Sequence, residues 1–396
     1  MRHRFLHVGV IFFLFLGAYL ILVKGMGAHY GNTNRIDDAL LAIEWDDAHA
    51  KALFNASRSD QVSNSVELLK SSIKNNPADS RAILSLAAIN KSNRTNELMT
   101  YVSQLRPADG DVQIKSAAFW LERGDHPRAF ALWNKALDLT SEYDNELFPF
   151  FIKSLQQKNT QKAFLEMISE AGKWWLRFFR FLNQQPDALP VMEYLFQIRQ
   201  SQKSINQLNE YKILIARMLR ESQSDKAYML WLNSLDEGRR NGIGLLFDGG
   251  FEQPAENYGF SWHYQTGPAF IETAYSVGVK GRAGLHVVFQ GKSEPFRHVW
   301  QRLRLLPGTY TLSGLGRAIS LRTVRGLVWR VTCNGRIVGK SHAFEGNTPW
   351  ARFSFQFEVP PDCESPVLSL IVEGRNPVEY RTSGEVWFDS LEIKHM

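Results

Sequence analysis

Cysteine and the short motifs of metal and nucleotide enzymes are scarce or missing in this sequence of 396 residues. Two cysteines exclude a disulfide-dense scaffold, and no CxxC or HExxH pattern indicates a metal site. A nucleophile elbow, a phosphate loop and an ordered pair of carboxylates are missing as well. The net charge of +6 is too small to indicate nucleic acid. The sequence therefore predicts neither an enzyme nor a nucleic-acid-binding protein.

The composition and its changes along the chain predict a multidomain protein. Apolar residues make up 44% and charged residues 22% of the sequence, which is typical of a globular chain. We expect three parts: an N-terminal transmembrane helix within residues 1–27, an all-α repeat domain at 34–240 and an all-β sandwich at 246–396.

The first part contains a long apolar run, residues 5–23, with the length of a membrane-spanning helix. Arg2 and Arg4 precede this run, and acidic residues follow it. By the positive-inside rule, the short N-terminus stays in the cytoplasm, and the bulk of the chain is periplasmic or extracellular. A cleaved signal peptide and a buried soluble helix are the alternatives. We favour the uncleaved single-pass anchor, because the run is long and residues 24–27 form a poor cleavage site.

Residues 34–240 have apolar positions at the spacings of three and four that are typical of helices. The segment 128–133 recurs at 162–167 and at 226–231, close to a period of 33–34 residues. The clearest repeat spans 110–143 and has small residues and tryptophans on two helices around a turn at Gly124. It resembles the tetratricopeptide repeat. This resemblance implies a solenoid of helix pairs whose concave groove binds a protein partner; a simple spacer is the alternative.

The most apolar stretch of the repeat domain is 174–181. Trp174, Phe178 and Phe181 share one helical stripe and are predicted to be core residues. Trp175 and Phe179 lie on a neighbouring face, where part of the helix could bind a partner.

Beyond residue 244 the apolar period changes to two, as in β-strands. Asn334-Gly335 lies between two strand-like runs and predicts a hairpin, and several short strands imply a two-sheet sandwich. The segments 246–252, 301–313 and 386–391 appear in the order found in the galactose-binding-like jelly roll of carbohydrate-binding modules, which this domain resembles. The resemblance implies a glycan as the ligand.

The same resemblance implies a structural calcium ion where the opening segment meets the last strand. Asp248, Glu252 and Asp389 are the carboxylates that could bind it, because calcium prefers oxygen ligands. Alternatively, these side chains cap turns or pair with arginine.

The alternation in 298–305 predicts which side chains face a ligand. Val299, Leu303 and Leu305 point inward, which leaves the intervening residues exposed on the opposite face. The strand 327–333 likewise points Trp329 inward and the adjacent Arg330 outward. The predicted ligand-binding residues are His298, Trp300, Arg302, Arg304 and Arg330. Trp262 and Trp387 are expected in the core.

No acidic residue occurs between Glu294 and Glu345, whereas nine Lys and Arg residues lie in this interval. Uncompensated cations create a positive field, and arginine binds carboxylate or phosphate in a bidentate manner. An acidic polysaccharide, a phosphorylated glycan or an anionic headgroup would fit. The alternative is an ordinary solvated surface whose acidic residues come from other strands.

Cys333 and Cys363 lie in the same predicted sandwich. A disulfide requires Cα atoms within about 7 Å, which the sequence does not reveal. Both a bridge and two free cysteines stay open, and free cysteines are the expectation.

Together these features predict a non-catalytic, membrane-anchored envelope protein. A repeat scaffold would bind a protein partner, and the sandwich would bind a glycan during assembly or export of an extracellular polysaccharide. A structural or sensory protein whose sandwich binds protein rather than sugar is the alternative, because sandwiches of this shape are not restricted to sugars.

Overall fold

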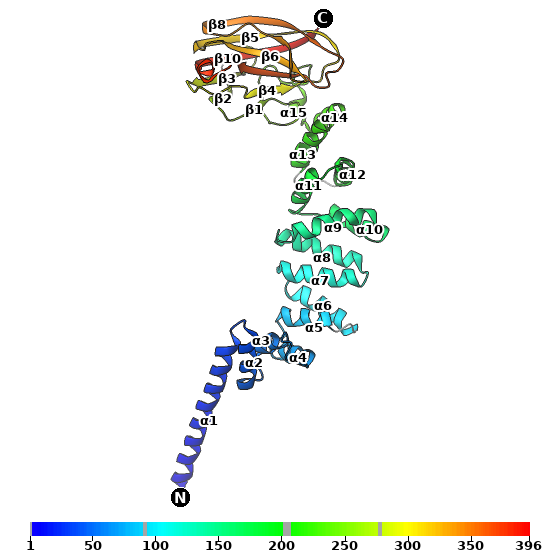
Figure 1. Cartoon of the computed structure of the whole chain (residues 1–396), viewed down its shortest axis with the longest axis vertical. Helices are drawn as coiled ribbons and strands as arrows, with labels where there is room; N and C mark the ends of the chain where they lie inside the picture. The colour runs from blue at the N-terminus through cyan, green and yellow to red at the C-terminus, as the bar shows by residue number, and fades with distance from the viewer. Residues whose placement is uncertain (1, 90–92, 201–206, 276–278) are drawn as a thin grey trace. The chain divides into compact units, whose positions relative to one another are not determined.

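The computed structural model describes residues 2–89, 93–200, 207–275 and 279–396, and their side chains outside 2–13 and 93–94. Helices come first along the chain and strands last (Figure 1). Two compact units are formed, Met1–Phe178 and Phe179–Met396. The helices before the strands are α1 (Arg2–Gly31), α2 (Ile36–Trp45), α3 (Ala50–Ala56), α4 (Ser65–Asn75), α5 (Ser80–Ile89), α6 (Asn93–Leu105), α7 (Gly110–Glu122), α8 (His126–Leu139), α9 (Asp144–Gln156), α10 (Lys158–Ser169), α11 (Trp175–Gln184), α12 (Leu189–Gln200), α13 (Gln207–Arg220), α14 (Ser224–Ser234) and α15 (Glu237–Arg240).

The predicted anchor, residues 5–23, lies on α1. Its residues 5–13 are outside the part of the chain whose side chains are described. Among the described residues, no helix has both the length and the apolar character that a membrane crossing requires.

The predicted repeat at 110–143 is a pair of packed helices, α7 and α8. Asp109 and Asp125 cap their N-termini by accepting hydrogen bonds from backbone N–H groups. Gly124 between them has φ = +76°, a left-handed conformation that glycine adopts without steric cost. Ala117, Ala129 and Ala136, the small residues expected between the helices, are fully buried, so the paired-helix prediction is confirmed here. The tetratricopeptide identity stays a prediction.

The prediction of an exposed face on α11 is wrong. Trp175 and Phe179, assigned to the face for a partner, are buried as completely as Trp174 and Phe178. Phe181, predicted as core, is only half-buried. Apolar side chains on two neighbouring stripes of this helix are therefore used in packing, not in binding a partner.

The C-terminal sandwich consists of two antiparallel five-stranded sheets, as the sequence predicts. The first sheet has the order β1-β4-β9-β6-β7 and the second β2-β3-β10-β5-β8. Side chains of both inner faces form one continuous core. The elements are β1 (His263–Tyr264), β2 (Ala269–Tyr275), β3 (Ala283–Gln290), β4 (Val299–Arg302), β5 (Gly308–Arg322), β6 (Leu327–Cys333), β7 (Arg336–Lys340), β8 (Gly346–Val359), β9 (Val367–Val372), α16 (Pro377–Tyr380) and β10 (Ser383–His395).

The hairpin predicted at Asn334-Gly335 joins β6 and β7. Both residues have positive φ, 48° and 78°, as a two-residue hairpin turn of the favoured type requires.

The last helices belong to the same compact unit as the sandwich. Trp231 of α14 packs its indole ring on Phe247 and Phe260, with ring centroids 5.0 and 5.6 Å apart. Its Nε1 donates a hydrogen bond to Ser261 Oγ at 3.2 Å. The change of composition near residue 241 matches the end of α15, whereas the second unit already begins within α11.

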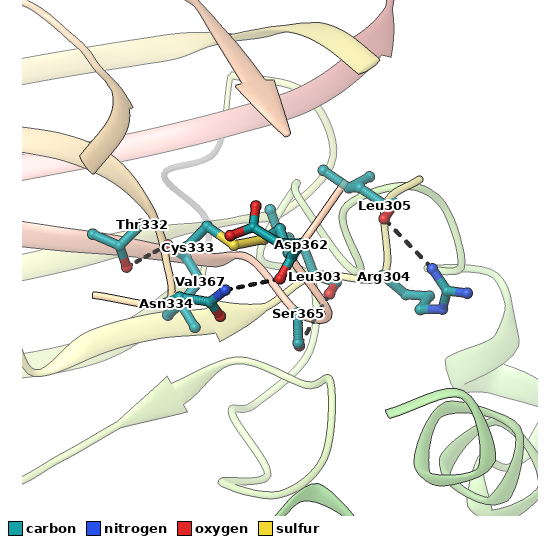
Figure 2. Close-up of a disulfide and its surroundings, with 10 residues drawn as sticks. Leu303, Arg304, Leu305, Thr332, Cys333, Asn334, Asp362, Ser365 and Val367 are labelled. Atoms are coloured by element: carbon teal, nitrogen blue, oxygen red, sulfur yellow. Dashed lines mark hydrogen bonds between the residues drawn. A yellow bond between two sulfur atoms is a disulfide. The ribbon is translucent and has the colours of Figure 1, made fainter. Parts of the chain in front are cut away.

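A disulfide joins Cys333 at the end of β6 to Cys363 in the loop before β9. Their Cα atoms are 5.7 Å apart, within the bonding range. Figure 2 shows the bond beside Asn334, whose Nδ2 donates to the backbone oxygen of Asp362 at 2.8 Å. The expectation of free cysteines is therefore wrong. Two loops that are distant in sequence meet at the same edge of the sandwich.

Candidate functional site

A row of polar and aromatic side chains crosses the outer face of the first sheet. Consecutive strands of this sheet place directly paired residues side by side, and the alternation within each strand directs them away from the core. In strand order the members are His263, Trp300, Ser369, Arg330 and Lys340. Since neighbouring strands are about 4.8 Å apart, the row is about 20 Å long. We call it the cross-strand row.

The aromatic end of the cross-strand row is a stacked pair. The rings of His263 and Trp300 are nearly parallel, with centroids 3.7 Å apart and planes at 8°. Burial lowers the pKa of His263 to about 4, the hydrogen bond to the Gly259 carbonyl partly opposes this shift, and the charge of Arg302 adds to it. The imidazole is therefore neutral near pH 7, and the stacked pair has no charge.

Two arginines on this face lack partners for part of their guanidinium groups. The Nε atoms of Arg302 and Arg330 are buried and have no hydrogen-bond partner among the described residues. Burial lowers the pKa of Arg302, although the group stays charged near neutral pH. A buried donor without an acceptor costs roughly 1–3 kcal/mol.

The alternation predicted for 298–305 is confirmed, because Val299, Leu303 and Leu305 are buried. The side chains assigned to the opposite face are half-buried instead of exposed. Arg302 and Arg304 lie beside Tyr228 and Trp231 of α14. Trp300 and Arg330 lie in the cross-strand row itself. Arg302 lies two positions further along β4, on the same face.

Arg304 lies beyond the end of β4, and the structure separates it from the other predicted ligand-binding residues. Its Nε is 2.6 Å from Oδ1 of Asp225 on α14. His298 precedes β4, and its Nδ1 accepts a hydrogen bond from the backbone N–H of Arg297. Burial lowers the pKa of His298, and Arg297 adds to this effect. Trp300, Arg302 and Arg330 thus lie on the outer face of the sheet, whereas His298 and Arg304 flank β4.

The carboxylates assigned to calcium are bound to backbone N–H groups instead. Asp248 accepts hydrogen bonds from the N–H groups of Glu252 and Gln253 at 3.0 and 3.1 Å. Oε1 of Glu252 accepts from Arg282 and Ala283 at 2.9 and 3.3 Å. Burial raises the pKa of Asp248 to about 6, against the effect of its N–H donors.

Asp389 has the same kind of surroundings. Its Oδ2 accepts from the N–H groups of Val279 and Lys280 at 2.6 and 2.9 Å, and its Oδ1 accepts from Ser390 Oγ. Within the described ranges, no three His, Cys, Asp or Glu side chains converge in a way that could hold a metal ion. The predicted calcium site therefore does not fit these residues, whose oxygens accept hydrogen bonds from backbone N–H groups at 252–253, 279–280 and 282–283.

Removal of divalent cations is accordingly expected to leave the sandwich unchanged. Thermal unfolding of the full chain in excess EDTA should give the same transition as in excess calcium chloride. A transition that rises by several degrees with calcium would contradict this assignment, because ligand binding to the native state raises stability.

The two tryptophans expected in the core differ. Trp262 is buried as predicted. The prediction for Trp387 is wrong: this side chain is half-buried on the outer face of the second sheet, because Val386 and Phe388 on either side of it point inward. Trp387 stacks on His286, with ring centroids 3.7 Å apart. Each sheet therefore has one stacked histidine–tryptophan pair on its outer face.

His263 and Ser369 are not among the ligand-binding residues that the sequence predicts. His263 directly follows the buried Trp262, and alternation alone would have placed it on the outer face. Ser369 lies in an apolar strand, and nothing in the sequence connects it with Trp300. Only the register of β4 with β9 does so.

Comparison with known proteins finds no matching family model and no matching curated protein. Solved structures similar to the chain include a CBM4 module with 19% identity, covering 38% of this chain and 99% of that one, at a TM-score of 0.28. The CBM22-1 xylan-binding domain of Paenibacillus barcinonensis Xyn10C has 14% identity, 38% and 94% coverage and a TM-score of 0.27. TmCBM61, in complex with β-1,4-galactotriose, has 16% identity, 39% and 99% coverage and a TM-score of 0.27. All three of these structures are described as carbohydrate-binding modules, and each match covers 38% or 39% of this chain.

Proposed function

We propose that the sandwich binds a glycan across the outer face of its first sheet, as the non-catalytic module of an envelope protein. The cross-strand row carries this proposal. It has an uncharged aromatic plane at one end, hydrogen-bonding groups at the other, and the short side chain of Ser369 between them. Saccharides are bound by this combination of apolar faces and polar groups.

The remaining parts of the proposal concern location and partners. The apolar run at 5–23 anchors the chain in a membrane, with the bulk of the protein periplasmic or extracellular. The Cys333–Cys363 disulfide supports this location, because such bonds persist in oxidising compartments. The helical region binds a protein partner, and a cleft of about 720 Å³ between Phe54 and Phe119 on α3–α7 supports this role. The assembly or export of an extracellular polysaccharide would suit this layout.

The test uses the full chain in mild detergent on an array of neutral and acidic polysaccharides. Trp300→Ala is expected to weaken glycan binding by about tenfold or more, since a lost stacking contact of about 1.4 kcal/mol has this effect.

The matched control is Trp387→Ala. It removes a tryptophan that is also half-buried and also stacks on a histidine, but on the other sheet. This variant should bind glycan like the wild type. Equal losses in both variants would show that the binding face is wrong, and an array on which the wild type binds no glycan would overturn the proposed function.

A further inference from the structure

A cleft of about 440 Å³ opens where β9 ends and β6 begins, next to the cross-strand row. Arg330 and Lys340 belong both to the row and to the lining of this cleft. Ile371, Tyr380 and the aliphatic part of Arg297 provide apolar surface beside the charged groups. We call it the arginine cleft.

The arginine cleft has more positive than negative side chains. Its cations are Arg297, Arg325, Arg330, Lys340 and Arg375, and Glu373 is the carboxylate in its lining.

Two of the cations are neutralised by nearby carboxylates. Lys340 Nζ lies 2.9 Å from Oε1 of Glu373. Arg325 donates from Nε and Nη2 to both oxygens of Glu379, at 2.6 and 3.2 Å. These pairs leave both cations in place but reduce their attraction for a further anion.

Three cations have no such neutralisation. Among the described residues, the guanidinium groups of Arg297, Arg330 and Arg375 have no carboxylate oxygen within 4.0 Å, although the backbone N–H of Arg375 donates to Oε2 of Glu379 at 2.9 Å. The Nε of Arg330 is also buried without an acceptor. Guanidinium groups that share a cleft repel each other, and an anion between them offsets this repulsion. An anionic group with oxygen acceptors would therefore complement these three cations.

The position of Arg330 connects this anion to the glycan face. Trp300 and Arg330 are in the same cross-strand row, separated by the one strand β9. The backbone positions of these two residues are about 10 Å apart. A short oligosaccharide that stacks one sugar on Trp300 can place a substituent of a later sugar at Arg330.

We propose that the arginine cleft binds the carboxylate of an acidic glycan, so that the ligand is a uronic-acid-containing polysaccharide. This inference rests on the proposed function, because it assumes that the sugar chain lies along the cross-strand row. The planar fork of Arg330 pairs with the two carboxylate oxygens. Arg297 and Arg375 contribute attraction from the rim.

The test compares polysaccharides with and without their charge. Alginate, polygalacturonate and hyaluronate are immobilised in native form and after chemical reduction of their carboxyl groups to alcohols. The full chain is expected to bind at least one native polymer about tenfold more tightly than its reduced form. Added salt should weaken the binding of the native polymer more than that of the reduced polymer.

Arg330→Gln should abolish the preference for the native polymer, and Arg375→Gln, at an exposed position, should reduce it in a second, independent variant. Arg317→Gln is the control: it removes the same charge from the same cation-rich segment, but lies on the second sheet opposite Trp387. It should keep the preference.

The outcomes separate the two proposals. Equal binding of native and reduced polymers, with Trp300→Ala still harmful, would overturn the arginine cleft and leave glycan binding in place. If the full chain binds neutral glycans on the array but no uronic-acid polymer, the arginine cleft would likewise be overturned and glycan binding would remain. Loss of preference in Arg317→Gln as well would attribute the effect to net charge and overturn the site. If the wild type binds no polysaccharide but an acidic peptide through Arg330, both proposals fail.

Discussion

Replacing both cysteines by alanine is expected to lower the unfolding free energy of the sandwich by about 3–4 kcal/mol. The disulfide joins positions 30 residues apart, and a cross-link of this span removes that much conformational entropy from the unfolded chain. Cys333 and Cys363 are also nearly buried, so the lost sulfur atoms add a packing penalty. The segment that contains β7 and β8 would then be held by its strand pairing and by its phenylalanine side chains in the core.

Hydrogen exchange of the full chain measures this effect within the sandwich alone. The slowest amides of β6, β8 and β9 should exchange roughly 300-fold faster in the double variant, if they exchange through global unfolding of the sandwich. Wild-type protein treated with a reductant should approach the variant, and the variant should not respond to the reductant. Unchanged protection in both would contradict a stabilising disulfide. Two reactive thiols in untreated, denatured protein would contradict the bond itself.

Much of the sandwich could be predicted because its causes are local. A period of two in 298–305 requires only that one face be buried, and Val299 is indeed buried while Trp300 is not. The turn at Asn334-Gly335 depends on the backbone freedom of two adjacent residues. Trp387 could have been placed by the same rule, because its apolar neighbours occupy the inward positions. The general tendency of tryptophan to be buried favours the core, but here the alternation decides its position.

The candidate site depends on register, which local patterns do not contain. His263, Trp300 and Ser369 are far apart in the sequence, and only the pairing of β1, β4 and β9 places them in one row. The cation-rich segment predicted a positive field but not its distribution. The structure pairs Arg304 with Asp225 and Arg325 with Glu379, while Arg330 keeps a buried donor without an acceptor.

The calcium prediction shows a second reason why the sequence does not determine the site. Three carboxylates near the junction of the first and last segments could serve either a cation or backbone donors, and the residue types are the same in both cases. In the structure, Asp248 and Asp389 accept from backbone N–H groups, whose positions follow from turns that the sequence does not specify. The donors to Asp248 come from the turn that directly follows it, whereas those to Asp389 come from Val279 and Lys280, which are distant in sequence.

Two buried groups in the sandwich are expected to give opposite dependences of stability on pH. Asp248 has a folded-state pKa of about 6 against an ordinary value of 3.8, chiefly because burial disfavours its charge. The folded state holds this proton more tightly than the unfolded state, so the contribution of Asp248 to stability falls as pH rises from about 4 to about 6. His263 has a folded-state pKa of about 4 against 6.5, again because of burial. The unfolded state holds this proton more tightly, so stability rises over nearly the same range.

Each shift corresponds to about 3 kcal/mol, and in the wild type the two effects largely cancel. Asp248→Asn keeps a side-chain oxygen for one N–H donor. Its unfolding free energy, relative to that of the wild type, should therefore increase by about 3 kcal/mol as the pH rises from 4 to 6.5. The unfolding free energy of His263→Gln, relative to that of the wild type, should decrease by about the same amount over this range. The double variant should again show the pH dependence of the wild type. Unfolding free energies from hydrogen exchange of the full chain at several pH values test this. Because other titrating groups contribute equally to all four proteins, a variant-minus-wild-type difference that stays constant with pH would contradict the assignment for that residue.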